Sequence, residues 1–212
     1  MIKILIADDH AIVREGLKQI VGETSDMVVS DEASNGHEVL RKVRENDYDV
    51  VVLDITMPGM SGLDVLKQLK SQRFEVPILV LSIHPEKQYA VRVLKAGASG
   101  YLTKESVPDE LIKALRRVSV GRKYISSSLA ERLALDLEIN SEKPLHESLS
   151  DREYQVMCLI ASGKPMKKIA DELCLSTKTV STYRSRILNK MNMQNNAELT
   201  HYAFANKLIA MG

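Results

Sequence analysis

The sequence predicts an α/β domain built on a doubly wound, five-stranded parallel sheet, followed by a separate all-α domain. Between residue 1 and about residue 120, short apolar runs alternate with helical patterns, and this alternation is typical of βα units with right-handed crossovers. From about residue 149 onward, four helical patterns follow one another without a strand between them. We therefore expect two cores, one in each part of the chain.

Each expected strand is a short apolar run that can be buried on both faces of a sheet. Gly22, Gly97 and Gly121 each follow an expected helix, at the position where a left-handed residue commonly ends it. The expected strands are Lys3–Ala7, Met27–Asp31, Val50–Leu53, Ile78–Leu81 and Gly100–Thr103, and the expected helices are Ala11–Val21, Glu38–Glu45, Gly62–Lys70, Glu86–Ala96 and Pro108–Val120.

From about residue 149 onward, the sequence predicts a four-helix domain that contains a helix-turn-helix. A capping box formed by Ser150 and Glu153 opens its first helix. The second and third helices are joined by the short turn Cys174-Leu175-Ser176, and two helices joined in this way are typical of DNA-binding proteins. The four expected helices run from Ser150 to about Ser162, from Met166 to Leu173, from Ser176 to about Met191, and from Asn195 to about Asn206.

These patterns divide the chain into residues 1–121, a connector of residues 122–148, and residues 149–212. In the connector, Ser126, Ser127 and Ser128 are expected to cap a short helix that runs through about Leu137. Residues 138–144 are polar and predict a flexible tether.

Charge is distributed unevenly along a chain whose net charge is only +1. Residues 1–120 carry 16 Lys and Arg against 18 Asp and Glu, a balance of −2, whereas residues 149–212 carry 9 against 5, a balance of +4. A basic second part indicates contact with a polyanion. The two cysteines, Cys158 and Cys174, lie in apolar helical patterns and are expected to be small core residues in a reducing compartment. With no apolar stretch of membrane-spanning length, we expect a cytoplasmic protein.

Acidic residues follow two of the expected strands. Asp8 and Asp9 come after the first apolar run, and Asp54 ends the third. Because the carboxyl ends of parallel strands share one edge, these side chains should meet there with Ser82 and Lys104. Three carboxylates at such an edge repel one another unless a hard divalent cation or a lysine lies between them. This arrangement indicates phosphate chemistry.

The same residues, taken in order with Met57-Pro58-Gly59 and Tyr101-Leu102-Thr103-Lys104, resemble the receiver domain of two-component response regulators, which has a flavodoxin-like fold. The resemblance covers residues 1–121. It implies that Asp54 is the phosphoacceptor and that Lys104 pairs with the phosphoryl oxygens. It also implies that Asp8, Asp9, Asp54 and the backbone carbonyl of Thr56 hold Mg²⁺ (or Mn²⁺).

Ser82 and Tyr101 are the candidate switch residues. A hydroxyl at Ser82 can donate to a phosphoryl oxygen, and its inward movement would leave a void that Tyr101 can enter. Such a coupled movement is a two-state element. His10, beside the acidic pair, is expected to begin a helix, and the alternative is that it tunes the acidic pocket.

The third helix of the second domain has one apolar face and one polar, basic face. Its apolar residues Val180, Ile187, Leu188 and Met191 are expected in the core. The opposite face suits the major groove of DNA. Lys168 and Lys190, with Lys164 and Lys167, are expected to contact phosphates. The expected reading face comprises Lys178, Thr182, Ser185, Arg186 and Asn189, with Thr179 at its edge.

The segments Leu149–Glu153, Ile160–Gly163, Lys168–Ala170 and Ser176–Tyr183 resemble the LuxR-type helix-turn-helix, so the whole chain resembles the NarL/FixJ response regulators. The chain departs from that pattern at Pro165-Met166, Ser181 and Tyr183, which leaves fewer phosphate contacts. The resemblance implies a sensor histidine kinase as phosphodonor, binding to double-stranded promoter DNA, and a homodimer in the phosphorylated form.

The leading hypothesis is a transcription regulator that phosphorylation of Asp54 switches, and not a turnover enzyme, although it can dephosphorylate itself. A phosphatase of the haloacid-dehalogenase type would need an acid at residue 56, where Thr56 stands. A flavodoxin-like FMN binder would have its phosphate repelled by Asp8 and Asp9. The remaining alternative is a DNA-binding regulator that works without phosphorylation and uses the first domain to dimerise.

Overall fold

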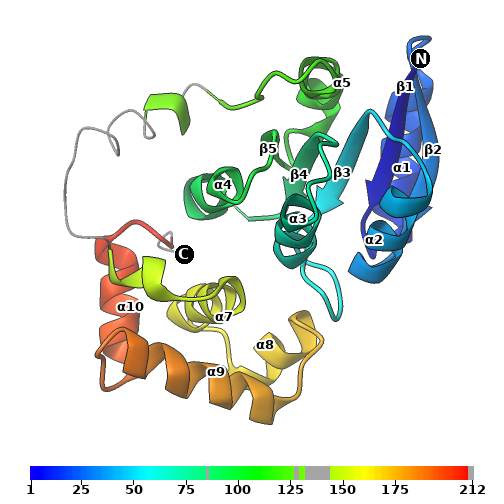
Figure 1. Cartoon of the computed structure of the whole chain (residues 1–212). Helices are drawn as coiled ribbons and strands as arrows, with labels where there is room; N and C mark the ends of the chain where they lie inside the picture. The colour runs from blue at the N-terminus through cyan, green and yellow to red at the C-terminus, as the bar shows by residue number, and fades with distance from the viewer. Residues whose placement is uncertain (85, 127–128, 132–143, 210–212) are drawn as a thin grey trace. The chain divides into compact units, whose positions relative to one another are not determined.

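The computed structural model describes residues 1–84, 86–126, 129–131 and 144–209 of the 212-residue chain. The chain divides into two compact units, Met1–Leu135 and Asp136–Gly212. The first is an α/β unit and the second is helical (Figure 1). In the described parts of the chain, no helix has the length and apolar character needed to cross a membrane.

The first unit contains a parallel sheet of five strands in the order β2-β1-β3-β4-β5, as predicted. Strand β1 pairs with β2 and β3, and β4 lies between β3 and β5. The strands are β1 (Ile2–Ala7), β2 (Met27–Ala33), β3 (Val50–Asp54), β4 (Ile78–Ser82) and β5 (Gly100–Thr103), and the helices are α1 (Ala11–Gly22), α2 (Gly36–Glu45), α3 (Gly62–Ser71), α4 (Glu86–Lys95) and α5 (Val107–Ser119).

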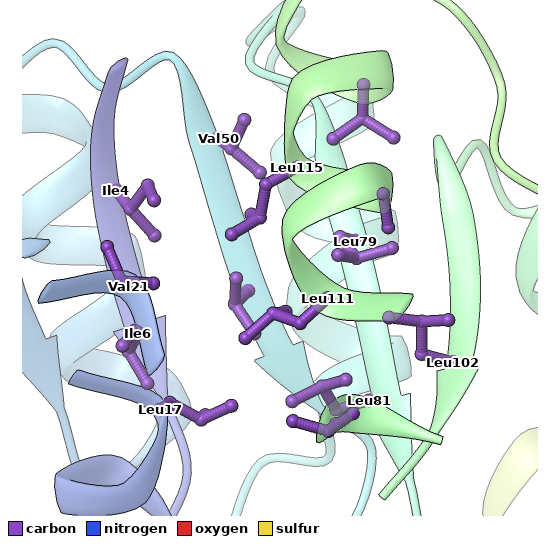
Figure 2. Close-up of a cluster of buried hydrophobic side chains, with 14 of the residues drawn as sticks. Ile4, Ile6, Leu17, Val21, Val50, Leu79, Leu81, Leu102, Leu111 and Leu115 are labelled. Atoms are coloured by element: carbon purple, nitrogen blue, oxygen red, sulfur yellow. The ribbon is translucent and has the colours of Figure 1, made fainter. Parts of the chain in front are cut away.

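Helices cover both faces of this sheet, so the central strands β3 and β4 are buried along their whole length, whereas the edge strand β2 carries exposed and polar residues. Alternate strand residues point to opposite faces. One face packs against α1 and α5 in a single buried cluster, where Leu111 and Leu115 of α5 lie over the strands (Figure 2). Helices α2, α3 and α4 cover the other face (Figure 1). The strand residues in the cluster are Ile4, Ile6, Met27, Val50, Val52, Leu79, Leu81 and Leu102.

The predicted helix ends are confirmed at two glycines and wrong at the third. Gly97 and Gly121 have left-handed backbones, with φ of +104° and +76°. Gly22 instead is the last residue of α1, and the helix is followed by Glu23 with φ of −73°. This helix therefore ends without a left-handed residue, because Thr24 closes the turn through hydrogen bonds from its backbone and its hydroxyl to the Val21 carbonyl.

The segment after α5 lies alongside the start of β5. Tyr124 makes an isolated parallel bridge with Gly100, and its backbone N–H donates to the Ser99 carbonyl at 2.9 Å. A β-carbon at Gly100 would lie 2.8 Å from the Tyr124 carbonyl oxygen, so this close approach requires glycine. Beyond it, the Ser126 hydroxyl accepts a hydrogen bond from the Leu129 N–H at 3.1 Å. Most of the short helix predicted through Leu137 lies outside the described residues.

The second unit contains the four predicted helices, preceded by a 3₁₀-helix inside the range expected as connector. The capping box is confirmed: Ser150 and Glu153 bond each other's backbone N–H groups. In the 3₁₀-helix, the His146 ring lies 2.9 Å from the Tyr202 hydroxyl of the last helix. The elements are η1 (Leu145–Ser148), α7 (Asp151–Ala161), α8 (Met166–Glu172), α9 (Thr177–Lys190) and α10 (Asn196–Ala205).

The buried face of α9 is the predicted one. Val180 and Ile187 are fully buried, and Leu188 and Met191 nearly so.

The expectation that both cysteines are core residues is right for one of them and wrong for the other. Cys158 is buried in α7, but Cys174 is exposed in the turn between α8 and α9, where its φ is +52°. Cys174 therefore lies in a tight turn after α8 and not on the buried face that the apolar pattern predicted.

Gly62, the first residue of α3, gives a stability test of the packing beneath Asp54. A β-carbon there would lie 1.9 Å from the Asp54 carbonyl oxygen. We expect Gly62→Ala to lower the free energy of unfolding, measured by urea denaturation, by about 1–3 kcal/mol or more.

The matched control is Gly16→Ala in α1, where a β-carbon meets nothing within 4 Å. Because alanine favours a helix over glycine, this change should raise stability by about 0.5–1 kcal/mol. Equal effects of the two substitutions would contradict the close packing of Gly62 on Asp54.

Candidate functional site

Two buried carboxylates and one lysine meet at the carboxyl edge of the sheet. Asp8 follows β1, Asp54 ends β3 and Lys104 follows β5. The Lys104 ammonium lies 2.8 Å from Asp54 Oδ2 and 2.6 Å from Asp8 Oδ2. The two carboxylates are almost completely buried, with side chains that are 1% (Asp8) and 3% (Asp54) exposed. The edge thus holds one cation between two anions.

Burial and charge oppose each other at this cluster. Burial raises the pKa of the Asp54 carboxyl to about 6, Lys104 acts to lower it, and Asp8 acts to raise it. For Lys104, burial acts to lower the pKa, but the charges and hydrogen bonds of Asp54 and Asp8 outweigh it and raise that pKa. The lysine therefore stays charged, and it stabilises the ionised form of Asp54.

The acidic pocket retains unused coordinating capacity. Asp8 Oδ2 and Asp9 Oδ1 are buried and, among the described residues, accept no hydrogen bond of good geometry, although Lys104 and His10 lie at ion-pair distance. Asp8, Asp9, His10 and Asp54 each offer one ligand atom within 4.8 Å of the others. Buried carboxylate oxygens without a hydrogen-bond donor are what a hard divalent cation requires, so these residues fit Mg²⁺.

Backbone contacts hold the two carboxylates in place. The Arg14 guanidinium donates to the Asp8 carbonyl at 2.8 Å and also pairs with Glu32 at 2.9 Å. The Thr56 N–H donates to Asp54 Oδ1 at 3.1 Å. The Asp54 backbone in turn packs against Gly62, which has no side chain to displace it. Arg14 carries no sequence signal, because an exposed face of a helix often holds an arginine.

Ser82 and Tyr101 lie next to this cluster and share a neighbour. The Ser82 hydroxyl accepts from the His84 N–H at 3.0 Å, and the Tyr101 hydroxyl donates to the His84 carbonyl at 2.8 Å. Ser82 is fully buried and Tyr101 is 2% exposed. The Ser82 carbonyl accepts from the Lys104 N–H at 2.8 Å. The Ser82 and Tyr101 side chains are therefore both bonded to the His84 backbone. The Ser82 backbone is also bonded to that of Lys104.

A second candidate site is the outward face of α9. Ser176 caps the helix by accepting from the Thr179 N–H at 3.0 Å. Two hydroxyls on the face are engaged with the helix backbone, because Thr182 donates to the Lys178 carbonyl and Ser185 to the Ser181 carbonyl. Thr179 is half-buried, as its place at the edge predicted. The exposed members of the reading face are Lys178, Thr182, Ser185, Arg186 and Asn189.

The basic residues beside this face differ in their partners. Lys168 of α8 is exposed. Lys190 of α9 instead makes an ion pair with buried Glu153 of α7, at 2.6 Å, and Lys164 pairs with Glu172 at 2.6 Å. An ammonium in an ion pair must share or leave its partner to contact a phosphate. The sequence marked Glu153 only as a capping residue, and its long-range partner carried no local signal.

Arg184 of α9 connects two helices. Its guanidinium donates to the Asn196 side-chain oxygen at 2.7 Å, at the first residue of α10. Because Asn195 also caps α10 through the Glu198 N–H, this end of the helix is fixed in two ways.

Comparisons with known proteins match both units. Residues 4–116 match the response regulator receiver domain, and residues 147–203 match the LuxR family of bacterial regulatory proteins. The chain is 38% identical over 209 residues to the response regulator UvrY of Escherichia coli K12, covering 98% of this chain and 96% of UvrY. It is 35% identical over 210 residues to the response regulator GacA of Pseudomonas aeruginosa PAO1, covering 99% and 98% of the two chains.

Solved structures resemble the whole chain as well. The RcsB response regulator of Salmonella typhimurium matches with a TM-score of 0.58 and 26% identity, covering 96% of this chain and 98% of RcsB. A complex of RcsB with DNA matches with a TM-score of 0.59 at the same identity and coverage. The fold and the carboxylate cluster define a receiver domain. The chain belongs to the two-component response regulators of the NarL/FixJ family, which join a receiver to a LuxR-type helix-turn-helix domain.

Glu153 provides a pH test of the helical unit. Burial acts to raise its pKa, but bonds from Lys190 and Ser150 outweigh burial, so the pKa lies below its ordinary value of 4.5. The ionised carboxylate therefore adds stability at neutral pH, and this stability is lost as the pH falls below about 4.5 through the folded-state pKa. We expect Glu153→Gln to be less stable at pH 7 by about 1–3 kcal/mol.

The difference in free energy of unfolding between the wild type and Glu153→Gln should become smaller as the pH is lowered. Urea denaturation at a series of pH values measures it. Glu172→Gln is the control, because its partner Lys164 is 40% exposed. We expect Glu172→Gln to lower the free energy of unfolding by less than about 1 kcal/mol. If Glu153→Gln lowers the free energy of unfolding by the same amount at pH 7 and at pH 3, the carboxylate charge has no role in stability.

Proposed function

We propose that this regulator is switched by transfer of a phosphoryl group to Asp54, and that the switch controls sequence-specific DNA binding by α9. The observation that carries the proposal is the Lys104 ammonium, which lies within 2.8 Å of Asp54 and 2.6 Å of Asp8 in a buried pocket. The fold does not need these charges to be buried together, whereas stabilising the negative charge of a transferring phosphoryl group does.

The residues present can perform the transfer. An Asp54 carboxylate oxygen attacks phosphorus, a new P–O bond forms, and the bond to the donor's leaving atom breaks with its electrons going to that atom. Lys104 is already beside the nucleophile and can neutralise the phosphoryl oxygens. The Thr56 N–H, which bonds the other Asp54 oxygen at 3.1 Å, keeps the carboxylate oriented. Bringing donor and nucleophile together in this way is most of what such a reaction requires.

Mg²⁺ is the proposed cofactor, with Mn²⁺ as the substitute, and when bound it supplies positive charge against the transferring phosphoryl group. Asp8, Asp9, Asp54 and the Thr56 backbone carbonyl would hold it. Asp8 Oδ2 and Asp9 Oδ1, which are buried and accept no hydrogen bond of good geometry from the described residues, support this assignment.

The proposed switch passes from Ser82 to Tyr101. Both side chains bond the His84 backbone, so a Ser82 hydroxyl that turned to donate to a phosphoryl oxygen would give up the His84 N–H. Burial raises the pKa of Tyr101, so its hydroxyl stays protonated and can keep donating to the His84 carbonyl if that backbone segment moves. A change at Asp54 would in this way reach the loop that precedes α4.

For the output, we propose that residues 1–121 form the receiver, 122–148 the connector and 149–212 the DNA-binding domain. The donor is a sensor histidine kinase, and the phosphorylated form binds double-stranded promoter DNA as a homodimer in the cytoplasm. Lys168 and Lys190 contact phosphates. The residues that read bases are Lys178, Thr182, Ser185, Arg186 and Asn189, with Thr179 at the edge of the face. Solved complexes of RcsB with DNA support this output. Thr56, in place of a general acid, supports a regulator and not a turnover phosphatase.

Asp54→Asn tests the phosphoacceptor. We expect it to abolish uptake of phosphate from an acyl phosphate in the presence of Mg²⁺, measured by intact mass, because an amide cannot act as the nucleophile. Asp47→Asn, at an exposed carboxylate, is the control and should be labelled like the wild type. Continued labelling of Asp54→Asn would reject the assignment.

Lys178→Ala and Arg186→Ala test the reading face. Each should weaken binding to a selected operator by about 1–3 kcal/mol if it contacts a base edge, and should relax the preference at one base position. The measurement is a binding isotherm at moderate salt, repeated on mismatched sites. Lys113→Ala, an equal change of charge at an exposed residue of α5, should leave the isotherm unchanged. An unchanged isotherm for both α9 variants would reject this docking face.

A further inference from the structure

His10 contributes an imidazole nitrogen to a pocket otherwise made of oxygens. Its Nδ1 lies 3.2 Å from Asp8 Oδ1 and 2.9 Å from Asp9 Oδ1. The His10 backbone N–H also donates to Asp8 Oδ1 at 2.9 Å, which fixes the residue at the start of α1. The ring therefore faces the acidic pair, although nothing in helix initiation requires this, because the side chain forms no cap.

The position of this nitrogen is compatible with a shared ion. One ligand atom from each of Asp8, Asp9, His10 and Asp54 lies within 4.8 Å of the others. Within this group, Asp8 is 1% exposed, and its Oδ2 lies 2.6 Å from the Lys104 ammonium without a hydrogen bond of good geometry. The His10 side chain is 62% exposed, so the ring lies at the mouth of the pocket and can adjust to an entering ion.

Ligand type discriminates between divalent ions. Mg²⁺ prefers oxygen ligands and retains its waters, so a neutral imidazole adds little to its binding. Co²⁺ and Zn²⁺ bind imidazole well. An imidazole beside three carboxylates should therefore raise the affinity for these ions selectively.

We propose that His10 Nδ1 is a ligand for a borderline transition ion of the Co²⁺ or Zn²⁺ type in this pocket, together with Asp8 and Asp9. The inference rests on the proposed function, since it concerns the same acidic pocket. With this role, His10 determines the metal preference of the acidic pocket. Co²⁺ or Zn²⁺ then competes with Mg²⁺ for the pocket in this chain. In this structure, the same nitrogen lies beside both carboxylates.

The test uses the full chain without an affinity tag. Co²⁺ is titrated by its visible absorbance and Mg²⁺ by calorimetry, for the wild type, His10→Ala and the control His37→Ala, which changes an exposed histidine of α2. We expect His10→Ala to weaken Co²⁺ binding at least tenfold and Mg²⁺ binding less than twofold. His37→Ala should change neither. Equal loss for the two ions, or no loss of Co²⁺ affinity, would overturn the proposal.

His10→Asp provides a second variant, and circular dichroism verifies that each variant is folded. An oxygen ligand in place of the nitrogen should shift the preference toward Mg²⁺, with a lower ratio of Co²⁺ to Mg²⁺ affinity than in the wild type. An unchanged ratio would also count against the proposal. Phosphate uptake is measured separately: if the wild type takes up none at Asp54 but His10→Ala still loses Co²⁺ selectively, the metal inference holds and the proposed function fails.

Discussion

The contact of one ammonium with two buried carboxylates is the interaction on which the first unit depends. Lys104 arrives from the end of β5 and Asp8 and Asp54 from the ends of β1 and β3. Without the lysine, two neighbouring carboxylates would be buried with little compensation, at a cost of several kcal/mol. The sheet topology creates this contact, because only parallel strands bring all three ends to one edge. The apolar faces of the strands hold that edge rigid.

Local sequence patterns were sufficient for the elements and for this edge. The apolar runs, the capping box of Ser150 and Glu153, and the face of α9 all depend on near neighbours in the chain, and the structure confirms them. The grouping of Asp8, Asp54 and Lys104 follows from topology, so it too could be predicted. The roles assigned to these residues remain proposals, because no geometry by itself shows a reaction.

What the sequence could not supply were contacts between distant residues and exceptions to local rules. Lys190, which is proposed to contact DNA phosphates, also pairs with Glu153, and the two residues lie 37 positions apart in the sequence. Gly22 ends a helix without a left-handed turn, and Cys174 occupies one although it is not a glycine. His10 was expected to begin a helix, since a histidine after two aspartates has no distinctive local pattern. Its ring contacts the neighbouring Asp8 and Asp9 carboxylates.

The central claim is that Asp54 accepts a phosphoryl group while Lys104 neutralises it. A crystal structure with Mg²⁺ and beryllofluoride tests this most directly. The account predicts beryllofluoride attached to an Asp54 oxygen, with the Lys104 ammonium moved from that carboxylate onto a fluorine and the metal held by Asp8 and Asp9. A well-ordered structure with Mg²⁺ in the pocket and no beryllofluoride on Asp54, or with Lys104 still paired only to Asp8 and Asp54, would contradict it.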